Sequence, residues 1–116
     1  MIIIAGHIDF APEDSAAAVD AGLKLQRETR ELRGCLDYLW SLDPAVPGRV
    51  HVFERWEDEA SLRAHFEGEK YAAMRQVLRG WDKRAVDIWK YRPDRMERVY
   101  DDQGNPRADF CGENAL

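Results

Sequence analysis

The sequence predicts an α+β fold of the ferredoxin-like kind, with a βαββαβ order and a four-stranded antiparallel sheet that carries two helices on one face. Two kinds of segment predict it: stretches rich in β-branched and aromatic residues, and stretches with apolar residues at helical spacing. They alternate as strand, helix, strand, and this order occurs twice within residues 1–93. A chain of 116 residues fits a single domain of this size.

The first unit begins with a strand over residues 2–10, which is rich in isoleucine and ends before a proline. Pro12 suits the first turn of the helix that follows, because its missing N–H would have no partner there. The helix is expected to end at Gly34, a residue that readily adopts the left-handed conformation. Its apolar stripe comprises Ala18, Ala21, Leu25 and Leu32.

A hairpin is predicted in the middle of the chain. Residues 35–43 form its first strand, with Leu36, Tyr38, Trp40 and Leu42 expected on one face. Residues 44–48 form the turn, and residues 49–57 form the second strand. Such a short connection requires antiparallel strands.

The second unit closes with a helical region and a last strand. Asp58 is placed to cap the helix, Gly68 interrupts it, and the helical pattern stops at Gly80. Residues 81–91 then form the fourth strand. We therefore expect a folded domain over residues 1–93, followed by a charged extension over 94–116 that is partly disordered or wraps a partner subunit.

Apolar residues occur on both faces of the first, second and fourth strands, as in the pairs Ile2/Ile3 and Ile88/Trp89. A sheet face that meets water is normally polar, so something is expected to cover the face opposite the helices. A second copy of the chain is the simplest cover, which predicts a homodimer.

The formal net charge of −5 argues against a general nucleic-acid binder, because binding to phosphates needs a concentrated basic surface. The apolar start is too short for a membrane span or a signal sequence, so a cytoplasmic protein without membrane partners is expected. Cys35 and Cys111 lie far apart and outside any CxxC pair, which favours reduced thiols. Motifs typical of dinucleotide, phosphate or zinc sites are absent, so neither a metal site nor a cofactor is predicted.

Two motifs resemble a known family. They are GCLxY over residues 34–38 and ERWEDEAxLxAHF over residues 54–66, preceded by IAGHI at residues 4–8. In this combination and order they resemble the antibiotic biosynthesis monooxygenase family, whose members are small dimeric α+β barrels. The resemblance covers roughly residues 1–92.

The resemblance implies a cofactor-independent monooxygenase that oxidises an electron-rich aromatic of the quinol, naphthol or anthrone type with dioxygen. Two alternatives stay open, because one fold supports several reactions: a small-molecule isomerase, and a non-catalytic dimeric ligand-binding or accessory protein. Haem-degrading relatives are also similar, but of the positions that matter to them only Trp56 matches. Arg75 stands where they have an iron-ligating histidine, and arginine cannot ligate iron.

Three residues are candidates for catalysis. His65 and His7 titrate near neutral pH and could take a phenolic proton, and Tyr71 could hydrogen-bond a substrate oxygen. Each also has a structural alternative; His65, for example, could fix the helix break by bonding a backbone carbonyl.

The candidate substrate-binding residues are mostly aromatic, because aromatic side chains stack on flat ligands. They are Trp56, Phe66, Met74, Trp40 and His51. Glu54 shares a strand face with Trp56 and heads into apolar surroundings. A structural ion pair with an arginine is the favoured interpretation there, and general-base duty the alternative.

Overall fold

The structure is a computed structural model that describes residues 1–110. Its elements follow the order βααββααβ. They are β1 (Ile2–Phe10), α1 (Ser15–Ala21), α2 (Leu23–Thr29), β2 (Cys35–Leu42), β3 (Arg49–Trp56), α3 (Glu59–Glu67), α4 (Glu69–Leu78) and β4 (Lys83–Tyr91).

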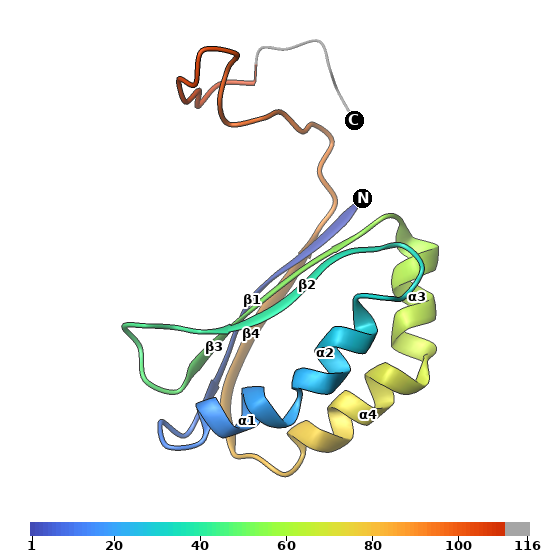
Figure 1. The fold of residues 1–116 in the computed structure, drawn as a ribbon, viewed down its shortest axis with the longest axis vertical. Coiled ribbons are helices and arrows are strands. Elements are labelled where there is room, and N and C mark those ends of the chain that lie inside the picture. The colour runs from blue at the N-terminus through green and yellow to red at the C-terminus, as the bar shows by residue number, and fades with distance from the viewer. Residues whose placement is uncertain (111–116) are drawn as a thin grey trace.

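The four strands form one antiparallel sheet with the order β2-β3-β1-β4. All the helices lie on one side of this sheet (Figure 1). We call that side the helix-facing side and the opposite side the outer face. The arrangement confirms the predicted ferredoxin-like α+β fold, including the hairpin of β2 and β3.

The first helical region differs from the single helix predicted from residue 12. It is divided at Gly22, which is buried, and its first helix begins only at Ser15. A Cβ atom at Gly22 would lie 3.1 Å from the sulfur of Met74 in α4, so the bare glycine lets the two helical regions pack closely. The break also changes which residues face the sheet. The buried ones are Ser15, Ala18, Gln26 and Thr29, whereas Ala21, which was expected in the apolar stripe, is exposed.

The predicted face of β2 also needs one correction. The register of β2 with β3 shifts between Cys35 and Asp37, as in a β-bulge. Leu36 is therefore exposed, and Cys35 packs against the core instead. From Tyr38 onward the predicted alternation holds, and Tyr38 and Trp40 are buried beneath the helices.

Strand β4 is an edge strand that pairs with β1, and Gly6 of β1 lies where the two backbones come close together. Gly6 has a φ of +154°, and a Cβ atom there would lie only 2.0 Å from the carbonyl oxygen of Asp87. Only glycine fits this position without a change in the backbone.

The core lies between the helices and strands β1, β2 and β3. Ile4, Val50 and Trp56 are among its buried side chains. Strand β4, in contrast, is exposed along nearly its whole length, and only Ile88 is partly buried. The helix-facing side of the sheet is therefore covered unevenly.

Residues 94–110 leave the end of β4 and extend away from the helices (Figure 1). They contain one isolated bridge, between Tyr100 and Pro106. The final part of the predicted extension and Cys111 lie outside the described residues, and the boundary at residue 93 stays a prediction. No helix in residues 1–110 has the length and apolar character needed to cross a membrane.

Candidate functional site

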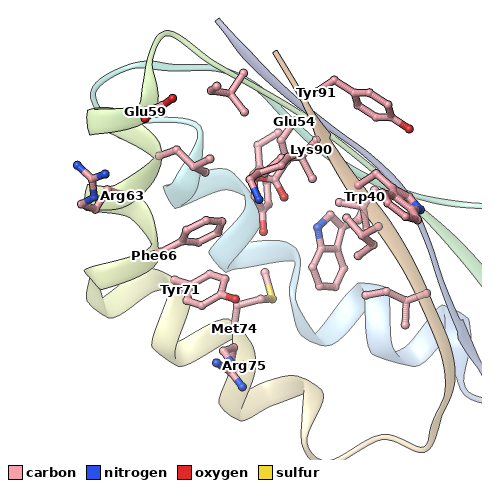
Figure 2. A pocket seen from close by; sticks show the side chains of 18 of the residues that line it. Trp40, Glu54, Glu59, Arg63, Phe66, Tyr71, Met74, Arg75, Lys90 and Tyr91 are labelled. Carbon is pink, nitrogen blue, oxygen red and sulfur yellow. The ribbon is translucent and has the colours of Figure 1, made fainter.

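A cavity of about 890 Å³ lies between the helix-facing side of the sheet and helices α3 and α4. Figure 2 shows Phe66, Tyr71 and Met74 reaching toward it from the helices. Across from them, Ile4 and Val52 line the cavity from the sheet. The walls are thus largely apolar or aromatic, as is usual for a small-molecule site.

One carboxyl group lies in this apolar wall. Glu54 is on β3, paired with Ile4 of β1 and with Tyr38 of β2, and all three side chains line the cavity. Glu54 is only 7% exposed. Its Oε1 accepts a hydrogen bond of 2.9 Å from the indole N–H of Trp56.

The expected ion pair at Glu54 is wrong: no arginine or lysine of residues 1–110 pairs with it. Its strand neighbours Ile4 and Tyr38 carry no positive charge, so the carboxylate is desolvated without compensation. Burial consequently raises the pKa of Glu54 to about 7, and the Trp56 hydrogen bond opposes this rise only in part. A carboxyl group with such a pKa can accept a proton near neutral pH.

Tyr38 lies directly beside Glu54 in the sheet. Its burial, together with the nearby Glu54 carboxylate, raises the pKa of the Tyr38 phenol well above the usual range. The phenol is therefore protonated at neutral pH and offers the cavity a hydroxyl donor.

His65 is buried, but it does not line the cavity. Its ring stacks on the indole of Trp56, with centroids 4.6 Å apart, and meets the ring of Tyr71 edge-on at 5.3 Å. Burial lowers the pKa of His65 to about 4, so the imidazole is neutral at pH 7. His65 thus belongs to an aromatic cluster behind the cavity wall.

The other sequence-predicted residues fall into two groups. Tyr71, Phe66, Met74 and Trp40 all line the cavity, and the structure brings them together. Trp56 is completely buried beneath His65 and reaches the cavity only through its hydrogen bond to Glu54.

His7 and His51 lie elsewhere. They face each other across β1 and β3 on the outer face of the sheet, with ring centroids 6.1 Å apart. The Nε2 atom of His51 lies 2.6 Å from a carboxylate oxygen of Asp43. The sheet separates both histidines from the cavity. Trp40, which was considered together with His51, projects from the opposite side, because it pairs with Val52.

The sequence favoured an ion pair at Glu54, and it did not identify Tyr38 and Lys90 as cavity residues. The alternation along β3 already indicated that Glu54 faces the helices. The absence of a cation nearby could not be found from the sequence, because it depends on which residues stand opposite on β1 and β2. Within residues 1–110, no group of three or more His, Cys, Asp or Glu side chains could hold a metal ion.

Comparison with known proteins places this geometry in a family. A family model described as antibiotic biosynthesis monooxygenase matches residues 1–77. A protein from Deinococcus radiodurans, provisionally assigned as an antibiotic biosynthesis monooxygenase, is 22% identical, with a TM-score of 0.77 over 87% of this chain and 100% of that one. A conserved protein from Methanosarcina mazei Go1 is 24% identical, with a TM-score of 0.70 over 78% of this chain and 90% of that one.

A third similar structure is Rv0793 from Mycobacterium tuberculosis, which is 21% identical with a TM-score of 0.68 over 84% of this chain and 96% of that one. No curated protein matches this chain. The structural similarities, at such low identity, establish the fold. The family model covers well over half of the sequence, and this chain therefore belongs to the antibiotic biosynthesis monooxygenase family.

Proposed function

We propose that this protein is a cofactor-independent monooxygenase that oxidises an electron-rich aromatic of the quinol, naphthol or anthrone type. The observation that carries the proposal is the Glu54 carboxyl group, buried in the wall of an apolar cavity without a cationic partner. Such a group is a suitable general base for a phenol, and family membership supports the reaction class.

In the proposed reaction the substrate supplies all the electrons. Glu54 accepts the phenolic proton, and the resulting electron-rich anion transfers electrons to dioxygen and forms a carbon–oxygen bond. For 1-naphthol the balance is C10H8O + O2 → C10H6O2 + H2O: the ring carbon is oxidised to a carbonyl, and the second oxygen atom leaves as water. The apolar walls exclude bulk water from the anion while it reacts.

The surrounding residues have defined roles in this proposal. Phe66 and Trp40 pack on the faces and edges of the aromatic substrate, and Met74 fills the space between them. The hydroxyl groups of Tyr71 and Tyr38 donate hydrogen bonds to the substrate oxygen. Glu54 takes the role of base that the sequence suggested for His65 or His7, because neither histidine lines the cavity.

The test compares oxygen uptake by the wild type and by Glu54→Gln with 1-naphthol and with a quinol. Glutamine keeps the shape and can still accept the Trp56 hydrogen bond, but it cannot take a proton. We expect turnover to fall by about 10²-fold or more. Glu57→Gln, at an exposed position just beyond β3, is the matched control and should retain activity.

Two results would contradict the proposal. Unchanged turnover in a folded Glu54→Gln protein would remove Glu54 from the mechanism. Conversion of the substrate at the same rate without dioxygen would replace the monooxygenase with the isomerase alternative.

We further propose that the outer face of the sheet packs against a second copy of the chain. Large apolar side chains gather there without cover, among them Trp89 at 63% exposed, Leu39 at 45% and Phe53 at 39%. A patch of this kind on a sheet is typical of an interface.

Analytical ultracentrifugation tests this homodimer. We expect a dimer for the wild type and a monomer for Trp89→Lys. Val86→Lys is the matched control, because Val86 is 61% exposed on the same strand but on the helix-facing side, opposite Ile8. A monomeric wild type, or equal effects of the two variants, would contradict this interface.

A further inference from the structure

The mouth of the cavity is lined by exposed basic side chains. Arg63 comes from α3, Arg75 from α4 and Lys90 from β4, and all three line the cavity. Figure 2 shows that Arg75 and Lys90 come from opposite sides of it. Among residues 1–110, none of the three forms an ion pair with a carboxylate. The mouth therefore carries uncompensated positive charge in a chain whose formal net charge is −5.

Several other arginines of this chain are neutralised by a nearby carboxylate. Arg49 pairs with Asp9 across β1 and β3 at 2.9 Å, and Arg55 pairs with Asp37. At the cavity itself, the lining carboxylate of Glu59 is already paired with Arg92. The charge of Arg63, Arg75 and Lys90 is thus left for an anion from outside the chain, and positive charge at the opening of an apolar cavity attracts such ligands.

The sheet register fixes how far apart the backbones of Lys90 and the proposed base Glu54 lie. Glu54 and Lys90 both pair with Ile4, one from each side, so the three side chains form one row on the helix-facing side. Their backbones lie two strand spacings apart, about 10 Å. Figure 2 shows Glu54 and Lys90 both reaching toward the cavity. The register places the apolar Ile4 of β1 between their strands.

Arg75 is held near the same opening. Its guanidinium lies over the ring of Tyr71, 5.9 Å from the centroid, and Tyr71 lines the cavity. Such a cation–π contact orients the side chain while leaving its N–H donors available. Arginine and lysine on the two sides of one opening suit a planar anion such as a carboxylate.

We propose that the substrate is an aromatic acid: a phenol whose ring also bears a carboxylate, bound by Lys90 and Arg75 at the mouth of the cavity. The phenolic end lies at Glu54, and the apolar ring lies over Ile4. The reverse orientation would place two carboxylates together in the cavity wall, which is unfavourable. This inference rests on the function proposed above, whose base fixes the inner end of the substrate.

The test measures binding under nitrogen, by isothermal titration calorimetry, so that no turnover is needed. The probes are 6-hydroxy-2-naphthoate, which has a phenol and a carboxylate at opposite ends, and 2-naphthol, which lacks the carboxylate. We expect the wild type to bind the acid about 3- to 10-fold more tightly than the neutral naphthol. Added salt should reduce this preference.

Lys90→Met and Arg75→Gln should each lose most of the preference for the acid while retaining affinity for 2-naphthol. Lys83→Met is the matched control, because Lys83 is an exposed lysine on the same strand that does not line the cavity. Equal wild-type affinity for the two probes, absence of binding of the acid, or the same loss of preference in Lys83→Met would each overturn the inference.

Oxygen uptake separates this inference from the proposed reaction. A Lys90-dependent preference for the acid without any oxygen consumption would uphold the anion site and contradict the monooxygenase. Oxidation of both 2-naphthol and the acid, together with equal affinities for the two compounds, would support the monooxygenase and contradict the anion site.

Discussion

The two β-α-β halves of this molecule share one topology but cover their edge strands very differently. In the first half, α1 and α2 lie directly against β2, whose Tyr38 and Trp40 are buried. In the second half, α3 packs on β3, whereas α4 packs on the other helices, and β4 is left exposed. Most of the residues that line the cavity come from this second half, and the others come from β1 and β2.

The side chains at the contacts explain the difference. In the first helical pair Ala18 is fully buried, and Gly22 lets this pair pack closely on Met74 of α4. The second pair presents Phe66 and Tyr71, whose rings stand against each other with centroids 5.0 Å apart and line the cavity. The first helical pair thus buries small residues, whereas the second pair presents aromatic rings to the cavity.

The largest effect is expected where β4 joins the rest of the sheet. Gly6→Ala should lower the free energy of unfolding by about 3 kcal/mol or more, because the new methyl group meets the backbone of Asp87. Urea denaturation measures this loss. Gly80→Ala is the control: its Cβ atom would lie 3.4 Å from the carbonyl oxygen of Val77, an ordinary contact, so a change below about 1 kcal/mol is expected. Similar losses in both variants would show that the close approach of β1 and β4 is not what requires glycine.

The second prediction compares the titration of the cavity with that of the aromatic cluster. The pKa of Glu54 is raised from 4.5 to about 7, so the folded state holds this proton more tightly than the unfolded state. The resulting stabilisation is complete below pH 4.5 and is lost as the pH rises from 4.5 to about 7. The pKa of His65 is lowered from 6.5 to about 4, so stability is lost as the pH falls from 6.5 to 4. Each effect amounts to about 3 kcal/mol, and between pH 4.5 and 6.5 they oppose each other.

The wild type should therefore show a nearly flat stability between pH 4.5 and 6.5. Glu54→Gln removes one of the two opposing groups, and the unfolding free energy of the variant should rise with pH over the same window. Urea denaturation at several pH values measures both curves. Parallel curves for the wild type and the variant would contradict the raised pKa of Glu54.

The smallest effect concerns packing in the two halves. Ala18 is fully buried, so Ala18→Leu should overpack the first half and cost about 1–3 kcal/mol. Val86→Leu, on the 61% exposed position of β4, should change stability by less than about 0.5 kcal/mol. Thermal denaturation of both variants checks the contrast. If both variants lost the same amount of stability, Val86 of β4 would have to be covered in solution, and α4 would have to lie closer to β4 than it does in this structure.

Much of the fold could be predicted from local patterns. The strand at residues 2–10, the shared face of Glu54 and Trp56 on β3, the Asp58 cap and the short hairpin loop each depend on neighbours in sequence, and the structure confirms them. The division of the first helical region at Gly22 could not be predicted, because it depends on Met74, which is distant in sequence. For the same reason Ala21 was placed on the wrong face.

The candidate site shows the same limit. Sequence motifs identified Tyr71, Phe66, Met74 and Trp40, which the fold brings to one cavity. They also indicated His7 and His51. The alternation of side chains along a strand shows which residues share a face, but it does not show which face of the sheet holds a cavity. The importance of Glu54 depended on the absence of a cationic neighbour, which only the pairing of three strands determines.

The sequence by itself determined the family, the order of the elements and the amphipathic faces of the strands, because these depend on residue type and spacing along the chain. The tertiary structure alone decided that β4 stays uncovered and that Glu54 is buried without a cationic partner. It also decided that Lys90 and Glu54 lie in one row, on the two strands that flank Ile4. Those features arise from desolvation and from contacts between residues far apart in the chain, and both exist only once the strands have paired.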